Sequence, residues 1–264
     1  MMKTLIEEMT GKDYREGDFE VALVPVGSTE NHGDHLPFGQ DTHVAYRLSK
    51  LIAERAGRTL VIPPLFYGMS EHYQHLPFSI SLRPENLIRV LDDVFASIYR
   101  WGIKRIVVIN GHDGNIAPLE VSAREFKVVH PDVLIAVLDK WWELPGRLLP
   151  QGTFEVWDGL GHAGEGETSI SLYLFPEMVD MSQARGVIPG LPLHVDVKWL
   201  FCELTPTGAT GDPTRATKEK GRMMTEVVVD VVVRFIEDMR KAGWKYGLSQ
   251  EARESIRAYE SIRA

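Results

Sequence analysis

The fold is decided by the stretch Val21-Ala22-Leu23-Val24-Pro25-Val26 and its continuation, Gly27-Ser28-Thr29-Glu30-Asn31-His32-Gly33-Asp34-His35-Leu36-Pro37-Phe38-Gly39-Gln40-Asp41-Thr42. The first six residues are apolar without polar alternation, which is typical of a short strand that is buried on both faces of a sheet. The residues that follow combine glycines with carboxylate and imidazole side chains. This composition predicts a functional site at the end of a strand rather than a linker.

Metal-binding side chains are dense in this continuation. Glu30 and His32 are two residues apart, so in an extended segment their side chains can point the same way. Carboxylate oxygen together with neutral imidazole nitrogen is the ligand combination of catalytic zinc, manganese or iron. Asp41 precedes an amphipathic pattern over residues 42–56, so it also occupies the position of a helix N-cap. Because Asp41 follows Glu30 and His32 closely in the sequence, a metal site is the preferred interpretation of these three residues.

Composition limits the classes of protein to consider. The chain has 264 residues, is 44% hydrophobic and 25% charged, and carries a formal net charge of −8. We expect one large α/β domain over residues 1–250 and a charged C-terminal tail over residues 251–264. The acidic balance argues against nucleic acid as a partner, and we expect no membrane span. Cys202 is the only cysteine, which excludes a thiolate metal cluster, and the N-terminus has no signal-peptide pattern, so a cytoplasmic protein is expected.

Strand and helix patterns alternate along the chain. Strands are predicted after the first one at 59–62, 104–109 and 134–138, and helices at 41–56, 84–101, 117–129 and 214–242. This alternation predicts a mostly parallel sheet with helices on both faces. Ligands of such folds bind beyond the carboxyl ends of the strands, and the polar clusters of this sequence follow the strands there.

Two further clusters add candidate residues. His112 follows a strand and an Asn-Gly pair, so it is either a turn residue with a local hydrogen bond or a metal ligand beside Glu30 and His32. The segment Gly161-His162-Ala163-Gly164-Glu165-Gly166-Glu167 contributes a histidine and two acids. Glu167 can be a first-turn acid that the helix dipole favours, or a ligand. His162 can bond to the adjacent glycine-rich backbone, or can transfer protons.

Taken together, these motifs resemble the creatininase family. The resemblance rests on Glu30-Asn-His32 with Asp41, on Asn110-Gly-His112-x-Gly-Asn115, on His162-Ala-x-x-x-Glu167-Thr-Ser, and on Gly211-Asp212-Pro213, in the order of the family. It implies an α/β amidohydrolase with two divalent ions (zinc, manganese or iron), bridged by an aspartate and a hydroxide, and a homo-oligomer, often a hexamer.

The resemblance also implies roles for individual residues. Glu30, Asp41 and His112 would hold one ion, and His32 with the bridging Asp41 the other. Creatininase supplies a glutamate two residues after the histidine of its second motif, where this chain has Gly114; Glu167 is the expected replacement, with Asp113 and Glu165 as weaker candidates. His162 would be the catalytic acid and base.

The substrate region is expected to include a loop with no sustained period, residues 66–77. The residues predicted to contact substrate are His35, Tyr67, Ser70, His72, Asp113 and Trp157, with Trp141, Trp142 and Trp157 as a possible lid. Leu76-Pro77-Phe78-Ser79 stands where relatives carry a Pro-Gly-Thr element. This difference and Gly114 bear on the substrate rather than on the fold.

The expected reaction is therefore attack of a metal-bridging hydroxide on the carbonyl of a small cyclic amide, lactam or formamide. Two other activities of the family stay open, namely carbon-carbon hydrolysis of a keto-inositol ring (of the 3-dehydro-scyllo-inosose type) and deformylation of a formamidopyrimidine. A third alternative is a metal-binding assembly protein that retains the fold without catalysis. An open metal position would favour an enzyme, because protein ligands close a structural site.

Overall fold

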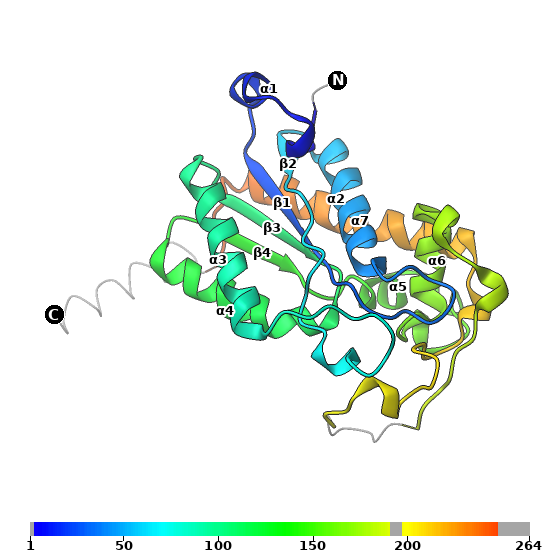
Figure 1. The fold of residues 1–264 in the computed structure, drawn as a ribbon. Helices are drawn as coiled ribbons and strands as arrows, with labels where there is room; N and C mark the ends of the chain where they lie inside the picture. Colours follow the sequence, from blue (N-terminus) through cyan, green and yellow to red (C-terminus); the bar gives the residue numbers. More distant parts are fainter. Residues whose placement is uncertain (1–2, 191–196, 248–264) are drawn as a thin grey trace.

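A four-stranded parallel sheet forms the centre of the computed structural model, which describes residues 3–190 and 197–247. In chain order the elements are α1 (Gly11–Glu16), β1 (Val21–Val26), α2 (Gln40–Ala56), β2 (Thr59–Val61), α3 (Pro84–Arg100), β3 (Arg105–Asn110), α4 (Ile116–Val129), β4 (Leu134–Leu138), α5 (Glu143–Leu148), α6 (Glu165–Leu174) and α7 (Lys218–Lys241). The predicted single-domain α/β fold is confirmed (Figure 1). The tail predicted at 251–264 lies outside the described residues.

The strand order is β2-β1-β3-β4, with Val21 in register with Thr59 on one side and with Arg105 on the other. After β1 the chain first builds β2 on one side, and it then crosses back to place β3 on the other side of β1. The carboxyl ends of β1 and β3 therefore form the topological switch point, which is where open α/β sheets bind ligands.

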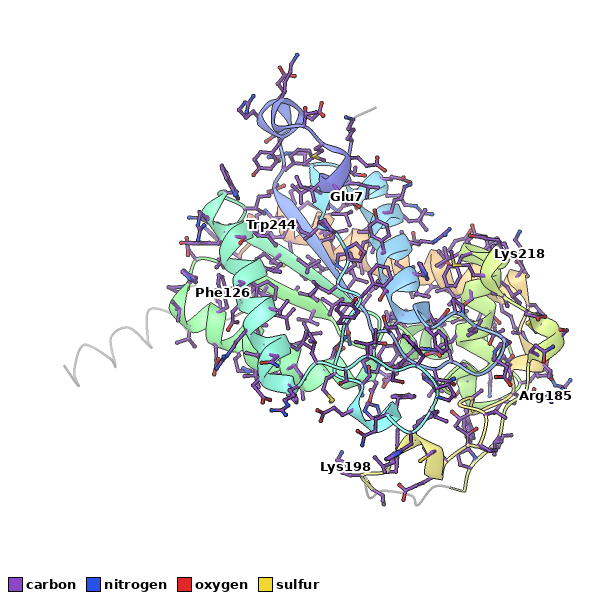
Figure 2. The ribbon with its side chains drawn as sticks, viewed as in Figure 1. Glu7, Phe126, Arg185, Lys198, Lys218 and Trp244 are labelled. Atoms are coloured by element: carbon purple, nitrogen blue, oxygen red, sulfur yellow. The ribbon has the colours of Figure 1, made fainter. Side chains whose placement is uncertain are left out.

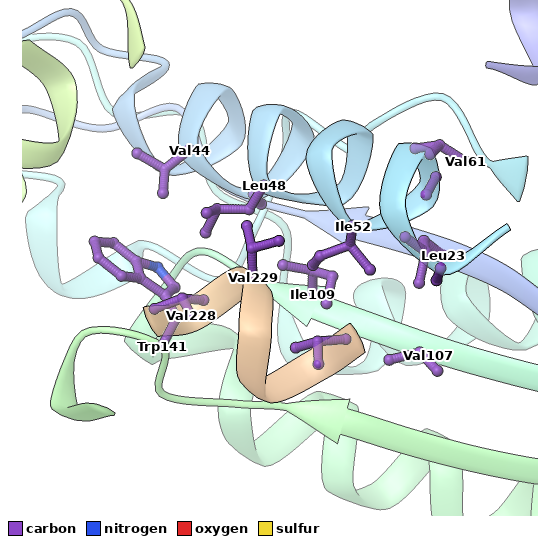
Figure 3. Packing of buried hydrophobic residues seen from close by; sticks show 14 of the residues in the cluster. Leu23, Val44, Leu48, Ile52, Val61, Val107, Ile109, Trp141, Val228 and Val229 are labelled. Carbon is purple, nitrogen blue, oxygen red and sulfur yellow. The ribbon is translucent and has the colours of Figure 1, made fainter. Parts of the chain in front are cut away.

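Helices cover both faces of the sheet. Because successive side chains of a strand alternate, Leu23 of β1 packs toward α2 and α7, whereas Val24 packs toward α3 and α4. Figure 3 shows the first of these layers, in which Leu48 and Ile52 of α2 meet Val229 of α7 above the sheet. Each such fully buried side chain contributes about 1.5–3 kcal/mol to stability, and this packing fixes α2 against the end of β1.

Three expectations differ from the structure. Helix α2 begins at Gln40 with Gly39 as its N-cap, so the N-cap position predicted for Asp41 is wrong; Asp41 lies in the first turn, and its side chain is free to face the site. Helix α7 begins at Lys218 rather than at residue 214, because residues 213–215 form a separate 3-10 turn and Thr217 caps the helix. The short helices α1 and α5 were not predicted.

No helix among the described residues combines the length and the apolar character needed to cross a lipid bilayer.

Candidate metal centre and active site

Five acidic and imidazole side chains meet at the switch point. Glu30 and His32 lie just beyond β1, Asp41 in the first turn of α2, His112 just beyond β3 and Glu167 in the first turn of α6. They form two groups that share Asp41, namely Glu30 with Asp41 and His112, and His32 with Asp41 and Glu167. A third metal-capable group joins Glu30 and His32 to His162, and within each group one ligand atom per residue lies within 4.8 Å of the others.

The two oxygens of Asp41 face different imidazole rings. His32 Nε2 lies 3.0 Å from Asp41 Oδ1, and His112 Nδ1 lies 3.2 Å from Asp41 Oδ2. His112 Nδ1 is also 3.2 Å from Glu30 Oε1, and His32 Nε2 is 3.8 Å from Glu167 Oε2. Separations near 3 Å are those expected between neighbouring ligands that each lie about 2.0–2.2 Å from one zinc ion.

Backbone carbonyls fix the tautomers of both rings. His32 Nδ1 lies 3.2 Å from the Glu30 carbonyl oxygen, and His112 Nε2 lies 2.9 Å from the Met69 carbonyl oxygen. Because a carbonyl oxygen only accepts hydrogen bonds, these two nitrogens carry the hydrogen. The opposite nitrogen of each neutral ring then presents a lone pair to the carboxylates, which is how proteins orient metal-binding histidines.

The cluster contains more negative charge than the protein compensates. Among the described residues, both carboxylate oxygens of Glu30 and His32 Nε2 are buried without a hydrogen-bond partner. Burial lowers the pKa of His32, but Asp41 and Glu167 outweigh it and raise that pKa to about 9. Burial raises the pKa of the Glu167 carboxyl to about 7. Without a cation the site therefore has to retain protons, and the donor set fits divalent ions.

Small residues keep the ligands in place. Ser28 donates a hydrogen bond of 2.6 Å from its hydroxyl to Asp41 Oδ2, a contact that the sequence analysis missed. A Cβ on Gly111 would lie 2.2 Å from the Asp41 carbonyl oxygen. A Cβ on Gly114 would lie 2.1 Å from the Met69 carbonyl oxygen and 2.5 Å from His112 Nε2. The backbone packing at Gly114 therefore leaves no room for a glutamate side chain at this position.

His162 stands beside the cluster with both ring nitrogens engaged. Its Nε2 lies 2.6 Å from the Asn31 carbonyl oxygen, and its Nδ1 lies 3.0 Å from the Tyr73 hydroxyl and 3.9 Å from Glu30 Oε1. Burial and the neighbouring His32 lower the pKa of His162 to about 3, so the ring is neutral. The sequence analysis did not single out Tyr73.

A cavity of about 460 Å³ opens next to the cluster, which is the size of a small-molecule site. Of the residues predicted to bind substrate, His72, Asp113 and Trp157 line it, together with His162. The lining also contains Tyr73, Trp142, Trp199 and Phe201, of which the sequence analysis considered only Trp142. Figure 2 shows Lys198, which precedes Trp199, at the end of the molecule away from Glu7.

The other predicted substrate contacts lie elsewhere. His35, Tyr67 and Ser70 are not among the described residues that line this cavity. His35 is buried and its Nε2 contacts the Thr168 hydroxyl at 2.9 Å, Ser70 is buried with its hydroxyl 3.2 Å from His112 Nε2, and Tyr67 is half exposed. Trp141 is buried in the core rather than at the cavity, so it cannot act as a lid.

The weaker candidates for the missing carboxylate also have other positions. Glu165 is fully buried, but it accepts hydrogen bonds from the backbone N–H groups of Glu155 and Val156 and pairs with Lys220 Nζ at 2.6 Å. Asp113 lines the cavity outside both metal-capable groups. Glu167 is the acid of this set that lies beside His32 and Asp41.

The sheet and the cluster define an α/β protein with a metal-capable site at its switch point. The chain belongs to the creatininase family, because the family model described as creatinine amidohydrolase matches residues 7–236.

Curated relatives have several activities. The chain is 33% identical over 225 residues to a mycofactocin precursor peptide peptidase of Mycobacterium ulcerans, covering 81% of this chain and 83% of the relative. It is 30% identical to the creatinine amidohydrolase of Pseudomonas putida, covering 88% of this chain and 96% of that relative. It is 28% identical to the 3-dehydro-scyllo-inosose hydrolase of Thermotoga maritima, covering 88% of this chain and 82% of that relative.

Solved structures show the same fold. A creatinine amidohydrolase (creatininase) superposes with a TM-score of 0.77 at 29% identity, covering 90% of this chain and 98% of the other. A mutant creatininase of the Zn-Zn type superposes with a TM-score of 0.75 at 28% identity, covering 90% and 98%. The chain is thus a creatininase-family hydrolase with a divalent-metal site, within a family whose members differ in substrate.

Proposed function

We propose that this protein is a dinuclear metal-dependent hydrolase that cleaves an amide bond in a small polar substrate. The observation that carries the proposal is the position of Asp41, whose two oxygens lie 3.0 and 3.2 Å from the lone-pair nitrogens of His32 and His112. A carboxylate between two imidazoles in this way is suited to bridge two cations. The assignment of two ions is supported by a solved creatininase of the Zn-Zn type. The choice between zinc and manganese stays open, because a manganese form of creatininase is also known.

In this proposal Glu30, Asp41 and His112 hold one ion, and His32, Asp41 and Glu167 hold the other. When bound, two divalent ions polarise a carbonyl group and lower the pKa of a water molecule. Against their four positive charges, the three carboxylates leave about one positive charge, which suits a hydroxide nucleophile. His162 is the acid and base, because it is a neutral imidazole at the cavity wall whose Nδ1 faces the cluster.

The lining of the cavity supports a neutral or cationic substrate. Among the described residues of the lining there is no Lys or Arg, whereas Asp113 and Glu143 add acid to the wall. Glu143 is paired with Lys140 at 3.2 Å, so Asp113 is the acidic group that a substrate would meet. A phosphate group, as in the 5′-monophosphate substrate of the deformylase relatives, would find no Lys or Arg side chain among the described residues of the lining.

Amide cleavage is preferred because the peptidase and the creatinine amidohydrolase among the relatives both break an amide bond. The second candidate is hydrolysis of a keto-inositol, which is a neutral polar ring and suits a wall whose described residues include no Lys or Arg. A non-catalytic metal-binding protein is disfavoured, because a cavity of about 460 Å³ lies directly against the cluster. A homo-oligomer, with a hexamer expected from the family, stays a prediction that sedimentation velocity would test.

The experiment is elemental analysis of the purified protein, followed by assays on creatinine, a short peptide, a keto-inositol and a formamidopyrimidine 5′-monophosphate. We expect about two equivalents of divalent metal per chain and turnover of an amide substrate. The His162→Asn variant is the matched control and is expected to retain metal but to lose activity. Absence of metal and of turnover after Zn²⁺ and Mn²⁺ are added would reject the proposal in favour of the non-catalytic alternative.

A further inference from the structure

The hydrogen-bond partners of His162 determine where its exchangeable proton can go. Nε2 lies 2.6 Å from the carbonyl oxygen of Asn31, which only accepts, so Nε2 carries the hydrogen. With its hydrogen on Nε2, the imidazole presents a lone pair at Nδ1, where it accepts a hydrogen bond from the Tyr73 hydroxyl at 3.0 Å. Neither ring nitrogen is left free to meet a substrate directly.

Tyr73 is held in one orientation. It is 5% exposed, its ring stacks on Phe201 with centroids 4.4 Å apart, and it lies 4.7 Å from the ring of His162. Its burial keeps the hydroxyl protonated, because it raises the pKa of Tyr73 well above 10. Tyr73 and His162 both line the cavity beside the cluster, although they are 89 residues apart in the chain.

We infer that the Tyr73 hydroxyl is a further catalytic group that relays protons between His162 and the substrate. This inference rests on the role of His162 in the proposed hydrolysis. As a water molecule attacks the amide carbon and the new C–O bond forms, the π electrons of the C=O bond move onto its oxygen, from where they re-form the carbonyl when the C–N bond breaks. One proton of the water passes to Tyr73 Oη while the hydroxyl proton of Tyr73 passes to His162 Nδ1.

The second half of the reaction reverses this transfer. When the C–N bond breaks, its electron pair stays on the leaving nitrogen, which takes the proton from Tyr73 Oη. Tyr73 then recovers a proton from His162 Nδ1, so both side chains return to their starting state. The net reaction moves one proton from water to the leaving amine. His162 Nε2 keeps its hydrogen throughout and donates it in the hydrogen bond to the Asn31 carbonyl oxygen.

The arrangement can be measured without activity, by ¹⁵N NMR of the zinc-loaded protein labelled at histidine. For wild type we expect His162 in the Nε2–H tautomer with a hydrogen-bonded Nδ1, and His162→Asn assigns its signals. In Tyr73→Phe, which keeps the ring packing, the Nδ1 signal is expected to move toward that of an unbonded imine nitrogen. Tyr99→Phe, whose hydroxyl faces Asp132 on the outside, is the matched control and should leave His162 unchanged.

A His162 ring with hydrogen on Nδ1 would overturn the inference. Direct ligation of His162 Nδ1 to zinc would do the same, and the approach of this histidine to Glu30 and His32 makes that a real competitor.

Kinetics provide the second arm. With the amide substrate identified above, Tyr73→Phe is expected to lower kcat by roughly 10²-fold or more, since general acid-base catalysis contributes about 10²–10⁴-fold. The loss should be largest for poor leaving groups, and it should disappear in a His162→Asn background, because the two groups act as one unit. An unchanged kcat, or additive losses, would refute the relay. A wild-type protein without activity would instead reject the proposed hydrolysis. The NMR experiment would still decide whether the Tyr73 hydroxyl donates a hydrogen bond to His162 Nδ1.

Discussion

Asp41 is the residue on which the metal site depends most. It belongs to two of the three metal-capable groups and accepts a hydrogen bond from Ser28. We therefore expect Asp41→Ala to abolish binding of both ions rather than of one. Elemental analysis checks this, with Asp113→Ala as control, because Asp113 lines the same cavity outside both groups. Retention of full metal content in Asp41→Ala would show that the two ions do not share this ligand.

Protonation of the apo cluster gives a second prediction at this scale. Asp41 and Glu167 raise the pKa of His32 to about 9, Glu30 and Asp41 raise that of His112 well above its usual value, and burial raises that of Glu167 to about 7. At pH 8 the apo protein is therefore expected to hold a proton on both His32 and His112, while Glu167 is mostly ionised. Metal ligation needs the unprotonated nitrogen.

Zinc binding at pH 8 is thus expected to release about two protons per chain, from His32 and His112, and more near pH 6.5, where Glu167 is also protonated. Calorimetric titrations in buffers of different ionisation enthalpy measure this number. Proton release that falls as the pH is lowered from 8 to 6.5 would contradict the assignment of Glu167 as a ligand.

Residues of the site differ in how far the sequence could predict them. Glu30, His32 and Asp41 lie within twelve positions of one another, so local spacing was sufficient to group them. The contact between Tyr73 and His162 spans 89 positions and lies in a loop without periodicity, so no local pattern indicates it. Glu165 and Glu167 are both first-turn acids of α6, and only the packing of that helix decides which of them faces His32.

At the scale of elements, α6 is held to α7 and to the segment before Trp157 by one buried carboxylate. Glu165 is fully buried, and Lys220 Nζ of α7 lies 2.6 Å from it. Removing one partner of a buried ion pair is costly, because the other charge remains in a low-dielectric environment. The Lys220→Met variant is therefore expected to lose about 3 kcal/mol of unfolding free energy.

Chemical denaturation measures this loss, and Lys218→Met on the exposed side of the same helix is the matched control, with an expected change within about 0.5 kcal/mol. Since Glu165 also accepts from the backbone of Glu155 and Val156, we expect the fluorescence of the nearby Trp157 to change in Lys220→Met. Equal stability of the two variants would show that the pair with Glu165 contributes nothing.

Long helices were predictable and short ones were not. The pattern of apolar residues placed α3 and α4 to within one residue, and β4 was predicted with its observed bounds. Helices α1 and α5 have six residues each, which is too short for a periodic pattern to emerge. The start of α2 was also predicted to within one residue, but Asp41 was wrong as its N-cap, because the N-cap is Gly39, which has no side chain to reveal it in the sequence.

For the whole molecule, metal content and stability are expected to be linked. Removal of the ions would leave the carboxylates of Glu30, Asp41 and Glu167 close together and largely buried. A ligand present at about 100 times its Kd stabilises the folded state by about 2.7 kcal/mol. Treatment with a chelator should therefore lower Tm by about 5–10 °C in a chain of this size. The far-ultraviolet circular dichroism should be unchanged, because the two hydrophobic layers do not include the cluster.

Differential scanning calorimetry of the holo and chelated protein tests this link. Asp41→Ala is the control, since its Tm should no longer respond to the chelator. An equal response of the variant and of wild type would place the stabilising metal elsewhere in the molecule.

The metal-capable residues and the wall of the cavity come from different stretches of chain. Four of the five proposed ligands belong to the first half of the chain, namely Glu30, His32, Asp41 and His112 in and around β1, α2 and β3. Much of the wall comes from residues 142–161 and 199–210. Mutation can therefore remodel the wall while the hydrolytic chemistry is inherited unchanged. One ancestral centre could in this way have given rise to enzymes for peptides, lactams and sugar-like rings, and grafting the two wall segments between family members is a direct route to new substrate preferences.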